Sequence, residues 1–518
     1  MTPGDRSTRR PGGPRDPRFR ETSASAPRRR GPNTLVVGTA MTVRQLLPAL
    51  SLIDPPPAVV GCLLPRPAIL PLAVLGGFDQ LETTASRPEV QQVLVSLPAV
   101  METTTRRMAE TLDRLGVAWR YLPPLADQLA GATTTVRRLG SPGQVDPSRL
   151  IDRRPRPLDD DAIGRALAGK TVLITGAGGS IGSELALAAA GYGPARLVLV
   201  ERGENALFEI DRQVAQRFPR LRREAVLHDV TQAGPTRRLL DRLRPDAVFH
   251  AAAHKHVPMM ESHPAEAVEN NFHGTRAVAD AAHDAGCERF VMISTDKAVN
   301  PSSVMGATKR LAELYIQHLN RQSDTRFCMV RFGNVLGSAC SLIPIWTDQL
   351  ARGGPITVTH RDMTRYFMTI PEAAGLVLQA GAYTGRAFAA EPGQAGETSG
   401  GDSGGEVFLL DMGEPIRILD LADRFLRQQG FVPDEDVPIE ITGPRPGEKL
   451  FEELAYSGED MLPTPHASIR RWRTTPPDAA QMQQILATLE RLRGGGVTAE
   501  TVAATLRSLL PEMVRAAA

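Results

Sequence analysis

A glycine-rich string, TGAGGSIGSE at residues 175–184, carries the clearest chemical signal in this sequence. It follows a run of β-branched residues and contains three glycines at G-x-x-G-x-x-G spacing. Between a strand and a helix, such glycines let the backbone approach the phosphates of a dinucleotide, whose charge faces the helix N-terminus. The string therefore predicts a pyrophosphate cradle. The expected contacts in this turn are Gly176, Gly179, Ser180, Ile181 and Gly182.

The ends of the next apolar runs also fit a dinucleotide. Glu201 ends the second run 19 residues after Gly182, where a carboxylate can accept hydrogen bonds from ribose hydroxyls. Arg202 beside it can hold a 2′-phosphate, so NAD and NADP both stay open, and NADP is the one we favour. A third run ends where an adenine ring would lie, and a fourth ends in residues small enough to let the cofactor cross the sheet edge. These residues are Asp229 with Val230, and Ala251, Ala252 and Ala253.

Lysine is rare in this chain, which makes each lysine informative. Only five of the 60 basic residues are lysines, so arginine carries nearly all of the positive surface charge. Arginine cannot supply a compact ammonium group with a shiftable pKa, so we expect chemistry at most of these lysines. A plain surface role is an equal alternative for the first of them. They are Lys170, Lys255, Lys297, Lys309 and Lys449.

The sequence predicts no metal site. His250, His254 and His256 lie close together, but no cysteine or second histidine cluster completes a tetrahedral set. We expect these histidines to line the core or the cofactor. The four cysteines stand singly without C-x-x-C spacing, which fits a reducing cytoplasm rather than a disulfide framework.

Alternating strands and helices are predicted to position these residues. From residue 170 onward, apolar runs alternate with helical patterns, which predicts an α/β fold with a doubly wound parallel sheet. Residues 33–132 repeat this alternation on a smaller scale and predict an additional N-terminal Rossmann-like α/β domain. Gly38 is the only glycine in its first turn, so we expect packing or substrate channelling there rather than a second dinucleotide.

The sequence divides into six predicted parts. They are a disordered basic tail (1–32), the N-terminal domain (33–132), a linker or wrapping arm (133–168), the dinucleotide-binding Rossmann domain (169–345), a smaller C-terminal substrate-binding region interleaved with it (346–475), and two amphipathic C-terminal helices (476–518). Within the fifth part, the run 391–406 is expected to form a mobile surface loop.

Composition limits the class of protein. With 518 residues, 42% of them apolar, the chain can form large cores. The net charge is +2, but the first 30 residues hold nine arginines against three acidic residues, so the remainder is slightly acidic. That balance argues against a nucleic-acid-binding protein. No apolar stretch reaches the ~20 residues of a membrane helix, and the N-terminus lacks a secretory signal, so we expect a soluble cytoplasmic protein.

Several ordered motifs together resemble a known family. The sequence is similar to extended short-chain dehydrogenases/reductases and, within them, to the CapD-like nucleotide-sugar 4,6-dehydratases of bacterial polysaccharide biosynthesis. The resemblance spans about residues 33–475, and we expect this chain to lack the N-terminal membrane helices of long members. Besides the glycine string, the motifs are HAAAHKHVPMME (250–261), NNFHGT (270–275), STDKAVNP (294–301), MGATKR (305–310), RFGNVLGS (331–338), TRYFMT (364–369) and RPGEKL (445–450).

The resemblance implies a reaction and the residues that perform it. Thr295 matches the hydroxyl residue beside carbon 4 of the sugar, and Lys309 matches the lysine that binds the nicotinamide ribose. Asp296 and Lys297 match the acid and base that mark dehydratases. Hydride leaves carbon 4, a base removes the carbon 5 proton, an acid protonates the departing carbon 6 hydroxyl, and hydride returns to carbon 6. A nucleotide-sugar 4-epimerase, the main alternative enzyme, needs neither group.

One position departs from the usual family pattern. The tyrosine that commonly precedes the lysine by four residues is Met305 here, and methionine cannot act as a base. A subset of the resembled dehydratases carries the same methionine, so we expect catalysis, with Lys309 or Lys297 taking the proton of the carbon 4 hydroxyl. A catalytically silent dinucleotide-binding scaffold of a glycan assembly complex is the alternative from another class.

The resemblance also implies the substrate and its contacts. A UDP-sugar is expected, with UDP-N-acetylglucosamine favoured, together with a tightly bound and recycled NAD or NADP and a homo-oligomeric state. Asn271 is expected to bridge backbone segments around the cofactor, with Lys255 nearby. GPRPGEK lacks the spacing of a phosphate loop, which excludes a nucleotide triphosphatase. The predicted substrate contacts are Lys255, Arg331, Asn334 and Arg365, with Arg445 and Glu448 at the diphosphate.

Overall fold

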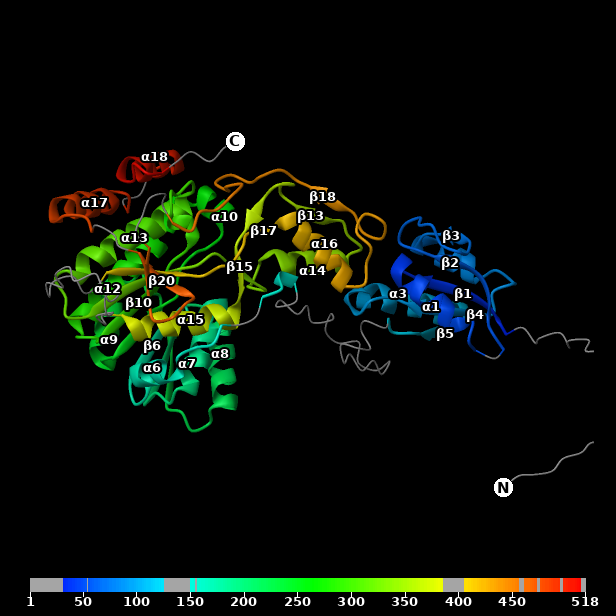
Figure 1. Ribbon diagram of the computed structural model, residues 1–518, viewed down its shortest axis with the longest axis horizontal. Helices are drawn as coiled ribbons and strands as arrows, with labels where there is room; N and C mark the ends of the chain where they lie inside the picture. Colours follow the sequence, from blue (N-terminus) through cyan, green and yellow to red (C-terminus); the bar gives the residue numbers. More distant parts are fainter. Residues whose placement is uncertain are drawn as a thin grey trace, which may run out of the picture.

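The computed structural model describes residues 31–53, 55–124, 150–153, 156–384, 405–455, 461–472, 476–493 and 497–513. These residues form two α/β units with a smaller part between them (Figure 1). Most of the predicted tail, of the predicted linker and of the predicted loop 391–406 lies outside the described residues.

The larger unit is built on a mostly parallel sheet. In the described chain its strands are β6 (Thr171–Thr175), β7 (Arg196–Glu201), β8 (Arg223–Leu227), β9 (Ala247–His250), β10 (Arg289–Ile293), β11 (Arg326–Arg331), β16 (Glu406–Leu410), β19 (Met461–Pro463) and β20 (Ile469–Trp472). Their order is β19-β20-β16-β11-β10-β9-β6-β7-β8, and β20 pairs antiparallel with both β16 and β19, whereas the other pairs are parallel. The order reverses between β6 and β9, where doubly wound sheets open a crevice at the carboxyl ends of their strands. This confirms the predicted fold class.

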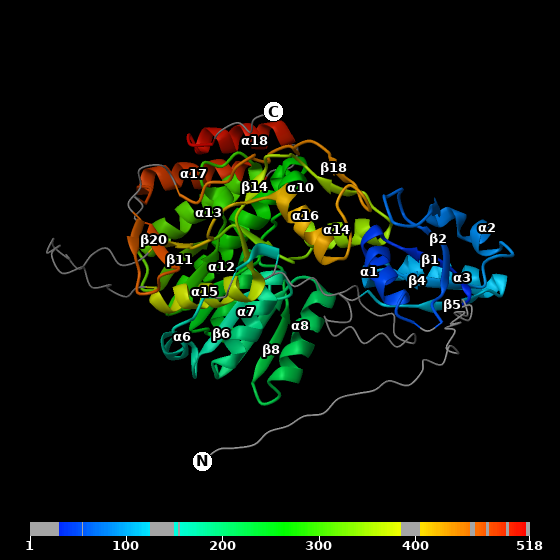
Figure 2. The same cartoon turned by 45° about the vertical axis from the view of Figure 1, so that its right-hand side comes forward.

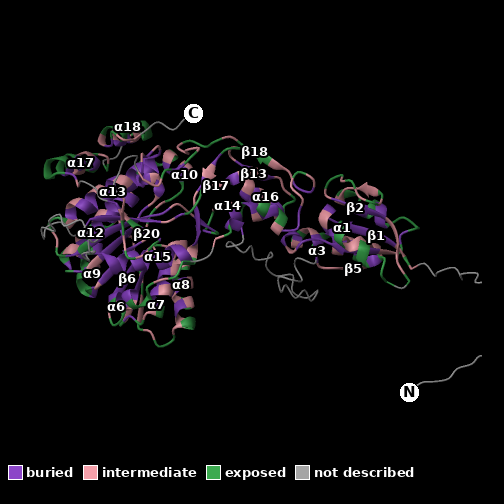
Figure 3. Ribbon diagram, viewed as in Figure 1, coloured by how far each residue is buried: buried purple, intermediate pink, exposed green. Residues whose placement is uncertain are grey.

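Helices cover both faces of this sheet, so its central strands are buried (Figure 3). They are α6 (Asp160–Leu167), α7 (Ser180–Gly191), α8 (Glu204–Arg217), α9 (Ala233–Leu243), α10 (Val257–Ser262), α11 (Pro264–Ala267), α12 (Gly274–Asp284), α13 (Val304–Asn320), α15 (Ile370–Tyr383), α17 (Ala479–Arg491) and α18 (Ala499–Leu509). One core lies under α9, α12 and α13, and the other lies under α6, α7, α8 and α15.

Several segments from outside the predicted limits 169–345 join this unit. Helix α15 and strands β16, β19 and β20 come from the region that was predicted to bind substrate and to be interleaved with it. Helix α6 belongs to the stretch predicted as a linker, yet its apolar residues Ile163 and Leu167 are fully buried in the same core as α15. The end of that stretch is therefore part of the larger unit. The two predicted C-terminal helices, α17 and α18, pack through Leu489 and Leu506 onto the core that contains α13.

The N-terminal unit contains a second parallel sheet, as the sequence predicted, and its strands lie in the order β3-β2-β1-β4-β5. Its elements are β1 (Asn33–Gly38), α1 (Ala40–Leu50), β2 (Ala58–Leu63), β3 (Val74–Gly76), α2 (Leu81–Ala85), β4 (Gln92–Ser96), α3 (Glu102–Leu115) and β5 (Ala118–Tyr121). Strand β3 and helix α2 were not predicted, because neither is long enough to show a periodic pattern.

A smaller part lies between the two sheets (Figure 2). Its elements are β12 (Asn334–Leu336), α14 (Leu342–Ala351), β13 (Ile356–Val358), β14 (Thr364–Arg365), β15 (Phe367–Thr369), β17 (Ile416–Arg417), α16 (Ile418–Gln428) and β18 (Ile439–Ile441). Trp346 of α14 and Phe425 of α16 share one hydrophobic core with Val95 and Leu112 of the N-terminal unit. The N-terminal unit is thus packed directly against the part predicted to bind substrate.

The first turn of the N-terminal unit is closed by an acidic residue from the middle part. The backbone N–H of Ala40, at the start of α1, donates to Oδ1 of the buried Asp436 at 2.7 Å. The other carboxylate oxygen accepts from the N–H of Val432 at 2.8 Å. A Rossmann domain binds phosphate at this helix terminus. The protein's own carboxylate occupies that place here, the arrangement expected of a packing role.

Among the described residues, the structure contains no helix with the length and apolar character needed to span a membrane.

Candidate active site

Two cavities open at the carboxyl ends of the central strands. The larger has a volume of about 750 Å³ and is lined by the glycine turn, by Thr295 and Lys297 after β10, and by Met305 and Lys309 of α13. The smaller, about 210 Å³, lies over the ends of β7 and β8. Gly179 is among the residues that line both. One elongated ligand can therefore occupy both cavities.

The glycine turn has the geometry predicted for a cradle. Gly176 has a φ of +64°, and a Cβ atom there would lie 2.7 Å from the Cα of Ala252. A Cβ on Gly182 would lie 2.0 Å from the carbonyl oxygen of Gly176. Larger residues would force the turn apart. Ser180 and Ile181, the first residues of α7 and predicted cofactor contacts, line the larger cavity.

Glu201 has a fixed orientation at the end of β7. Its Oε1 accepts hydrogen bonds from the backbone N–H groups of Arg202 (2.9 Å) and Gly203 (3.0 Å), and its Oε2 accepts from Gly178 (3.2 Å). The Arg202 side chain donates to Oδ1 of Asn270 at 3.4 Å. The smaller cavity is lined by Glu201 and Arg202, together with Asp229, Val230, Ala251, Ala252 and Ala253.

These residues fit a dinucleotide. A turn that only glycine can form leads into the N-terminus of α7, which attracts the charge of a pyrophosphate. The smaller cavity beyond it offers a carboxylate to ribose hydroxyls and small side chains at the sheet edge.

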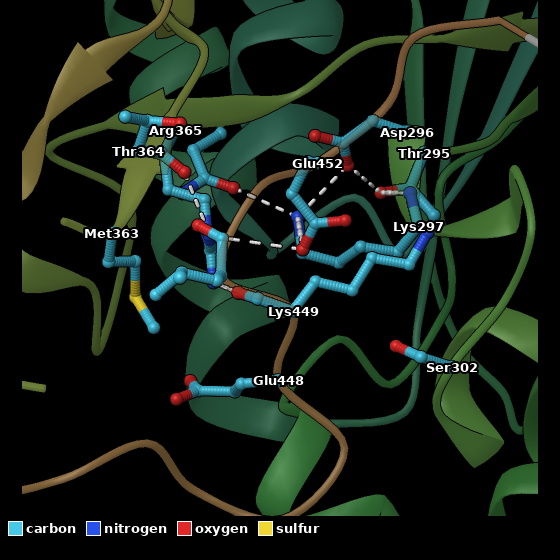
Figure 4. Close-up of polar contacts among 12 residues, drawn as sticks. Thr295, Asp296, Lys297, Ser302, Met363, Thr364, Arg365, Glu448, Lys449 and Glu452 are labelled. Carbon is cyan, nitrogen blue, oxygen red and sulfur yellow. Dashed lines mark hydrogen bonds and ion pairs between the residues drawn. The ribbon is translucent and has the colours of Figure 1, made fainter. Parts of the chain in front are cut away.

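Thr295, Asp296 and Lys297 form a hydrogen-bonded group immediately after β10 (Figure 4). The Thr295 hydroxyl donates to Oδ1 of Asp296 at 2.9 Å, and Nζ of Lys297 donates to the same oxygen at 2.9 Å. Lys297 also donates to Oδ1 of Asn334 at 3.0 Å. Asp296 is fully buried. The Thr295 hydroxyl and the Lys297 ammonium group can therefore both exchange protons with Asp296.

Glu452 is a member of this site that the sequence reading missed. Its Oε1 lies 3.8 Å from Nζ of Lys297 and 3.9 Å from Nε of Arg365. The carboxylate lies between these two cations in Figure 4. The available signal was a pair of glutamates, Glu452 and Glu453, one residue beyond RPGEKL. A charge pair beyond a motif is weak evidence without a fold to place it.

The charges of this group shift each other's protonation. Burial works to lower the pKa of Lys297, but the carboxylates of Asp296 and Glu452 outweigh it, so the pKa is raised. Burial raises the pKa of Glu452, and the nearby Asp296 adds to that shift against the opposing effect of Lys297. The resting site therefore holds a charged lysine between two carboxyl groups.

Met305 and Lys309 line the larger cavity from successive turns of α13. The helix is capped by Ser303, whose hydroxyl accepts from the N–H of Gly306 at 3.1 Å. Nζ of Lys309 donates to the carbonyl oxygen of Ile293 at 2.6 Å, at the end of β10. Burial lowers the pKa of Lys309 to about 8.

The loop between β12 and α14 is tied to the glycine turn and to Lys255. Nζ of Lys255 donates to Oγ of Ser338 (3.2 Å) and to the carbonyl oxygen of Ala339 (2.8 Å). The N–H of Ala339 donates to Oγ of Ser180 at 3.0 Å. Lys255 thus closes one wall of the larger cavity.

The Asn271 side chain joins the backbone of His254 to the side chain of Thr308 on α13. Its Oδ1 accepts from the N–H of His254 at 2.7 Å, and its Nδ2 donates to the His254 carbonyl oxygen at 3.0 Å. The same amide donates to Oγ1 of Thr308 on α13 at 3.2 Å. His250 is buried between Thr175 and Thr275, which fits the predicted core role. Among the described residues, no cluster of potential metal ligands is present.

The predicted substrate contacts divide into two groups. Asn334, Arg365, Arg445 and Glu448 line the larger cavity. Arg331 does not: it is 1% exposed and donates to Glu313 from Nε at 2.7 Å and from Nη2 at 2.6 Å. The prediction for Arg331 is corrected accordingly. Position 331 is the last residue of β11 and its side chain enters the core, which the motif RFGNVLGS alone does not reveal.

Comparison with known proteins identifies the family. The family described as "Polysaccharide biosynthesis protein" matches this chain over residues 172–474. The chain belongs to this family. The probable polysaccharide biosynthesis protein EpsC of Bacillus subtilis is 42% identical over 395 residues, which are 76% of this chain and 62% of EpsC. The capsular polysaccharide biosynthesis protein CapD of Staphylococcus aureus is 42% identical over 388 residues, 74% of this chain and 61% of CapD.

This family member thus spans about three fifths of the length of those two relatives. The inverting UDP-N-acetylglucosamine 4,6-dehydratase of Campylobacter jejuni is 32% identical over 300 residues, which are 57% of this chain and 80% of that enzyme.

Proposed function

We propose that this protein is a nucleotide-sugar 4,6-dehydratase that converts UDP-N-acetylglucosamine to its 4-keto-6-deoxy derivative. The observation that carries the proposal is the Asp296–Lys297 pair inside the cavity that the glycine turn also lines. Arg445, whose guanidinium is held by Glu448 at 2.6 Å, lines the same cavity and suits a diphosphate. The similarity to a dehydratase of UDP-N-acetylglucosamine favours this substrate.

We propose NAD as the cofactor, in place of the NADP favoured from the sequence. When bound, NAD accepts hydride from carbon 4 of the sugar and returns it to carbon 6. The Glu201 carboxylate is fixed by three backbone N–H groups where the adenosine ribose would lie, and its charge repels a 2′-phosphate. Arg202 donates to Asn270 instead of standing free to bind that phosphate.

Thr295 and Asp296 offer a path for the carbon 4 hydroxyl proton that Met305 cannot take. The Thr295 hydroxyl can accept this proton from the sugar while passing its own proton along the 2.9 Å hydrogen bond to Asp296. Asp296 then holds the proton that the carbon 6 hydroxyl needs to leave as water. In this account Lys309 binds the nicotinamide ribose, and the proton removed in the first step is used in the second.

Lys297 is the base for the carbon 5 proton. Asn334 and Asp296 orient its nitrogen within the cavity. Once carbon 4 is a ketone, the carbon 5 proton is acidic, and its removal by the amine of Lys297 together with proton donation by Asp296 eliminates water across carbons 5 and 6. A 4-epimerase has no use for this acid and base, so the pair favours the dehydratase over that alternative.

Two variants test the proposal. We expect Asp296→Asn and Lys297→Ala to lower the rate of water loss from UDP-N-acetylglucosamine by roughly a hundredfold or more, with NAD binding unchanged. Lys170→Ala is the matched control, because Lys170 pairs with Glu288 and Asp246 on the surface. Full activity in both site variants would overturn the roles proposed for this pair, whereas a wild-type protein that binds NAD but removes no water from the sugar would favour a scaffold.

A further inference from the structure

Glu452 lies beside the catalytic pair, and no step described so far uses it. Its side chain is 4% exposed and comes from the segment after β18, whereas Asp296 and Lys297 follow β10. Its Oε1 faces Nζ of Lys297 at 3.8 Å. Its Oε2 is buried and has no hydrogen-bond partner among the described residues. A buried carboxylate oxygen without a partner is costly, and protonation removes that cost.

The surrounding contacts hold Glu452 in this position. The guanidinium of Arg365 donates to the carbonyl oxygens of Thr364 (2.7 Å), Leu450 (3.2 Å) and Lys449 (2.8 Å). Nζ of Lys449 donates to the carbonyl oxygen of Val299 at 3.1 Å, which fixes the segment to the loop after β10. The charged groups facing Glu452 are Asp296, Lys297, Arg365 and Lys449. Burial and Asp296 raise the pKa of Glu452 against the three cations, which favour its carboxylate form, so this group can take up a proton.

The proposed reaction needs a place for one more proton. Lys297 is charged at rest, so it must lose a proton before it can accept the one from carbon 5. Asp296 cannot take this proton, because it already holds the proton of the carbon 4 hydroxyl at that stage. A second carboxylate close to Nζ of Lys297 is therefore required.

We propose that Glu452 accepts the ammonium proton of Lys297 and so makes Lys297 a base for carbon 5. The inference rests on the proposed dehydratase function. An N–H bond of Lys297 breaks and an O–H bond forms on Glu452, so an ion pair becomes a neutral pair without any oxidation or reduction. Lys297 then takes the carbon 5 proton while Asp296 gives its proton to the leaving hydroxyl. If Lys297 returns its proton to carbon 5, the proton on Glu452 passes back to Lys297. If solvent supplies the carbon 5 proton on the other face, Glu452 releases its proton to solvent, and in both cases the site regains its starting charges.

A substrate analogue that cannot lose water separates the removal of the carbon 5 proton from the other steps of the reaction. UDP-6-deoxy-N-acetylglucosamine has no carbon 6 hydroxyl, so it can be oxidised at carbon 4 and can exchange its carbon 5 proton, but it cannot eliminate water. Absorbance of the reduced cofactor reports carbon 4 oxidation, and deuterium uptake at carbon 5 from D₂O reports the action of Lys297.

In Glu452→Gln we expect carbon 4 oxidation within about twofold of the wild type and carbon 5 exchange slower by roughly a hundredfold. Glu452→Asp, which keeps a carboxylate, should recover part of the exchange. Glu209→Gln is the control, since this glutamate pairs with Arg212 on the surface of α8 and is not among the residues that line the cavity. Unchanged exchange in Glu452→Gln, or an equal loss of oxidation and exchange, would overturn the inference. A wild-type protein that oxidises and dehydrates no UDP-sugar would instead overturn the proposed function.

Discussion

Replacing Arg331 tests whether this residue stabilises the fold, as the structure shows, or binds substrate, as its motif suggested. In Arg331→Met, Glu313 stays buried but loses two of its hydrogen bonds, those from Nε and Nη2 of Arg331. It keeps the hydrogen bonds from Ser294 (2.7 Å) and Arg310 (3.3 Å). Leaving a buried charge without its main partner costs about 3 kcal/mol. At roughly 2 °C per kcal/mol for a domain of this size, Tm should fall by about 6 °C.

The loss of thermal stability in Arg331→Met should increase as the pH rises. In the wild type, burial works to raise the pKa of Glu313, but Arg331 outweighs burial and the pKa is lowered from 4.5. Its stabilising contribution is therefore present above pH 4.5 and is lost as the pH falls through the lowered value. Without Arg331, burial dominates and the pKa rises above 4.5. The difference in Tm between variant and wild type should therefore widen from pH 5 to pH 7.

Thermal unfolding and steady-state kinetics measure the two roles separately. We expect a lower Tm and an unchanged KM for UDP-N-acetylglucosamine. Adding Glu313→Gln to Arg331→Met should recover part of the stability, because no uncompensated charge is then buried and Arg310 keeps its contact with Glu512 at 3.3 Å. A tenfold rise in KM with an unchanged Tm would refute the structural role and restore the substrate contact.

Three further predictions follow from single contacts. Thr295→Val should slow carbon 4 oxidation about a hundredfold, whereas Thr295→Ser should retain it. Adding Met305→Tyr, which supplies another base, should rescue Thr295→Val. Normal cofactor reduction in Thr295→Val alone would contradict the proton path. Asp436→Ala removes the acceptor of the α1 N-terminus and should lower stability by ~2 kcal/mol without changing NAD affinity, as thermal unfolding with and without NAD can show. Lys309 loses its charge above pH 8, so NAD affinity measured by titration should weaken as the pH rises through 8, whereas Lys309→Arg should show no such change between pH 7 and 9.

The glycine turn and the strand ends were predictable from the sequence because their chemistry is local. Gly182 approaches Gly176 within the same turn, and a regular sheet brings Gly176 to Ala252, just after β9. The alternation of elements predicted a doubly wound sheet, although not the order of its strands. The placement of Glu201 follows from the same regularity. For the same reason, the N-terminal sheet was predictable although its first turn contains one glycine.

The contacts that the sequence did not reveal join distant segments. Glu452 reaches Lys297 across 155 positions of the chain, and Asp436 reaches Ala40 across 396. No periodicity or spacing encodes such pairs. Arg331 is a case in which the sequence suggested a contact that the structure does not have. Its position inside a motif suggested a ligand, but its charge is paired with the buried Glu313 on α13.

The most direct test of the central claim follows a label from carbon 4. The protein is incubated with UDP-N-acetylglucosamine deuterated at carbon 4, and the product is examined by mass spectrometry and proton NMR. The proposed function predicts the loss of one water, with the deuterium retained and moved to a new carbon 6 methyl group. A sugar of unchanged mass with deuterium still at carbon 4 and the galacto configuration would contradict it and establish an epimerase.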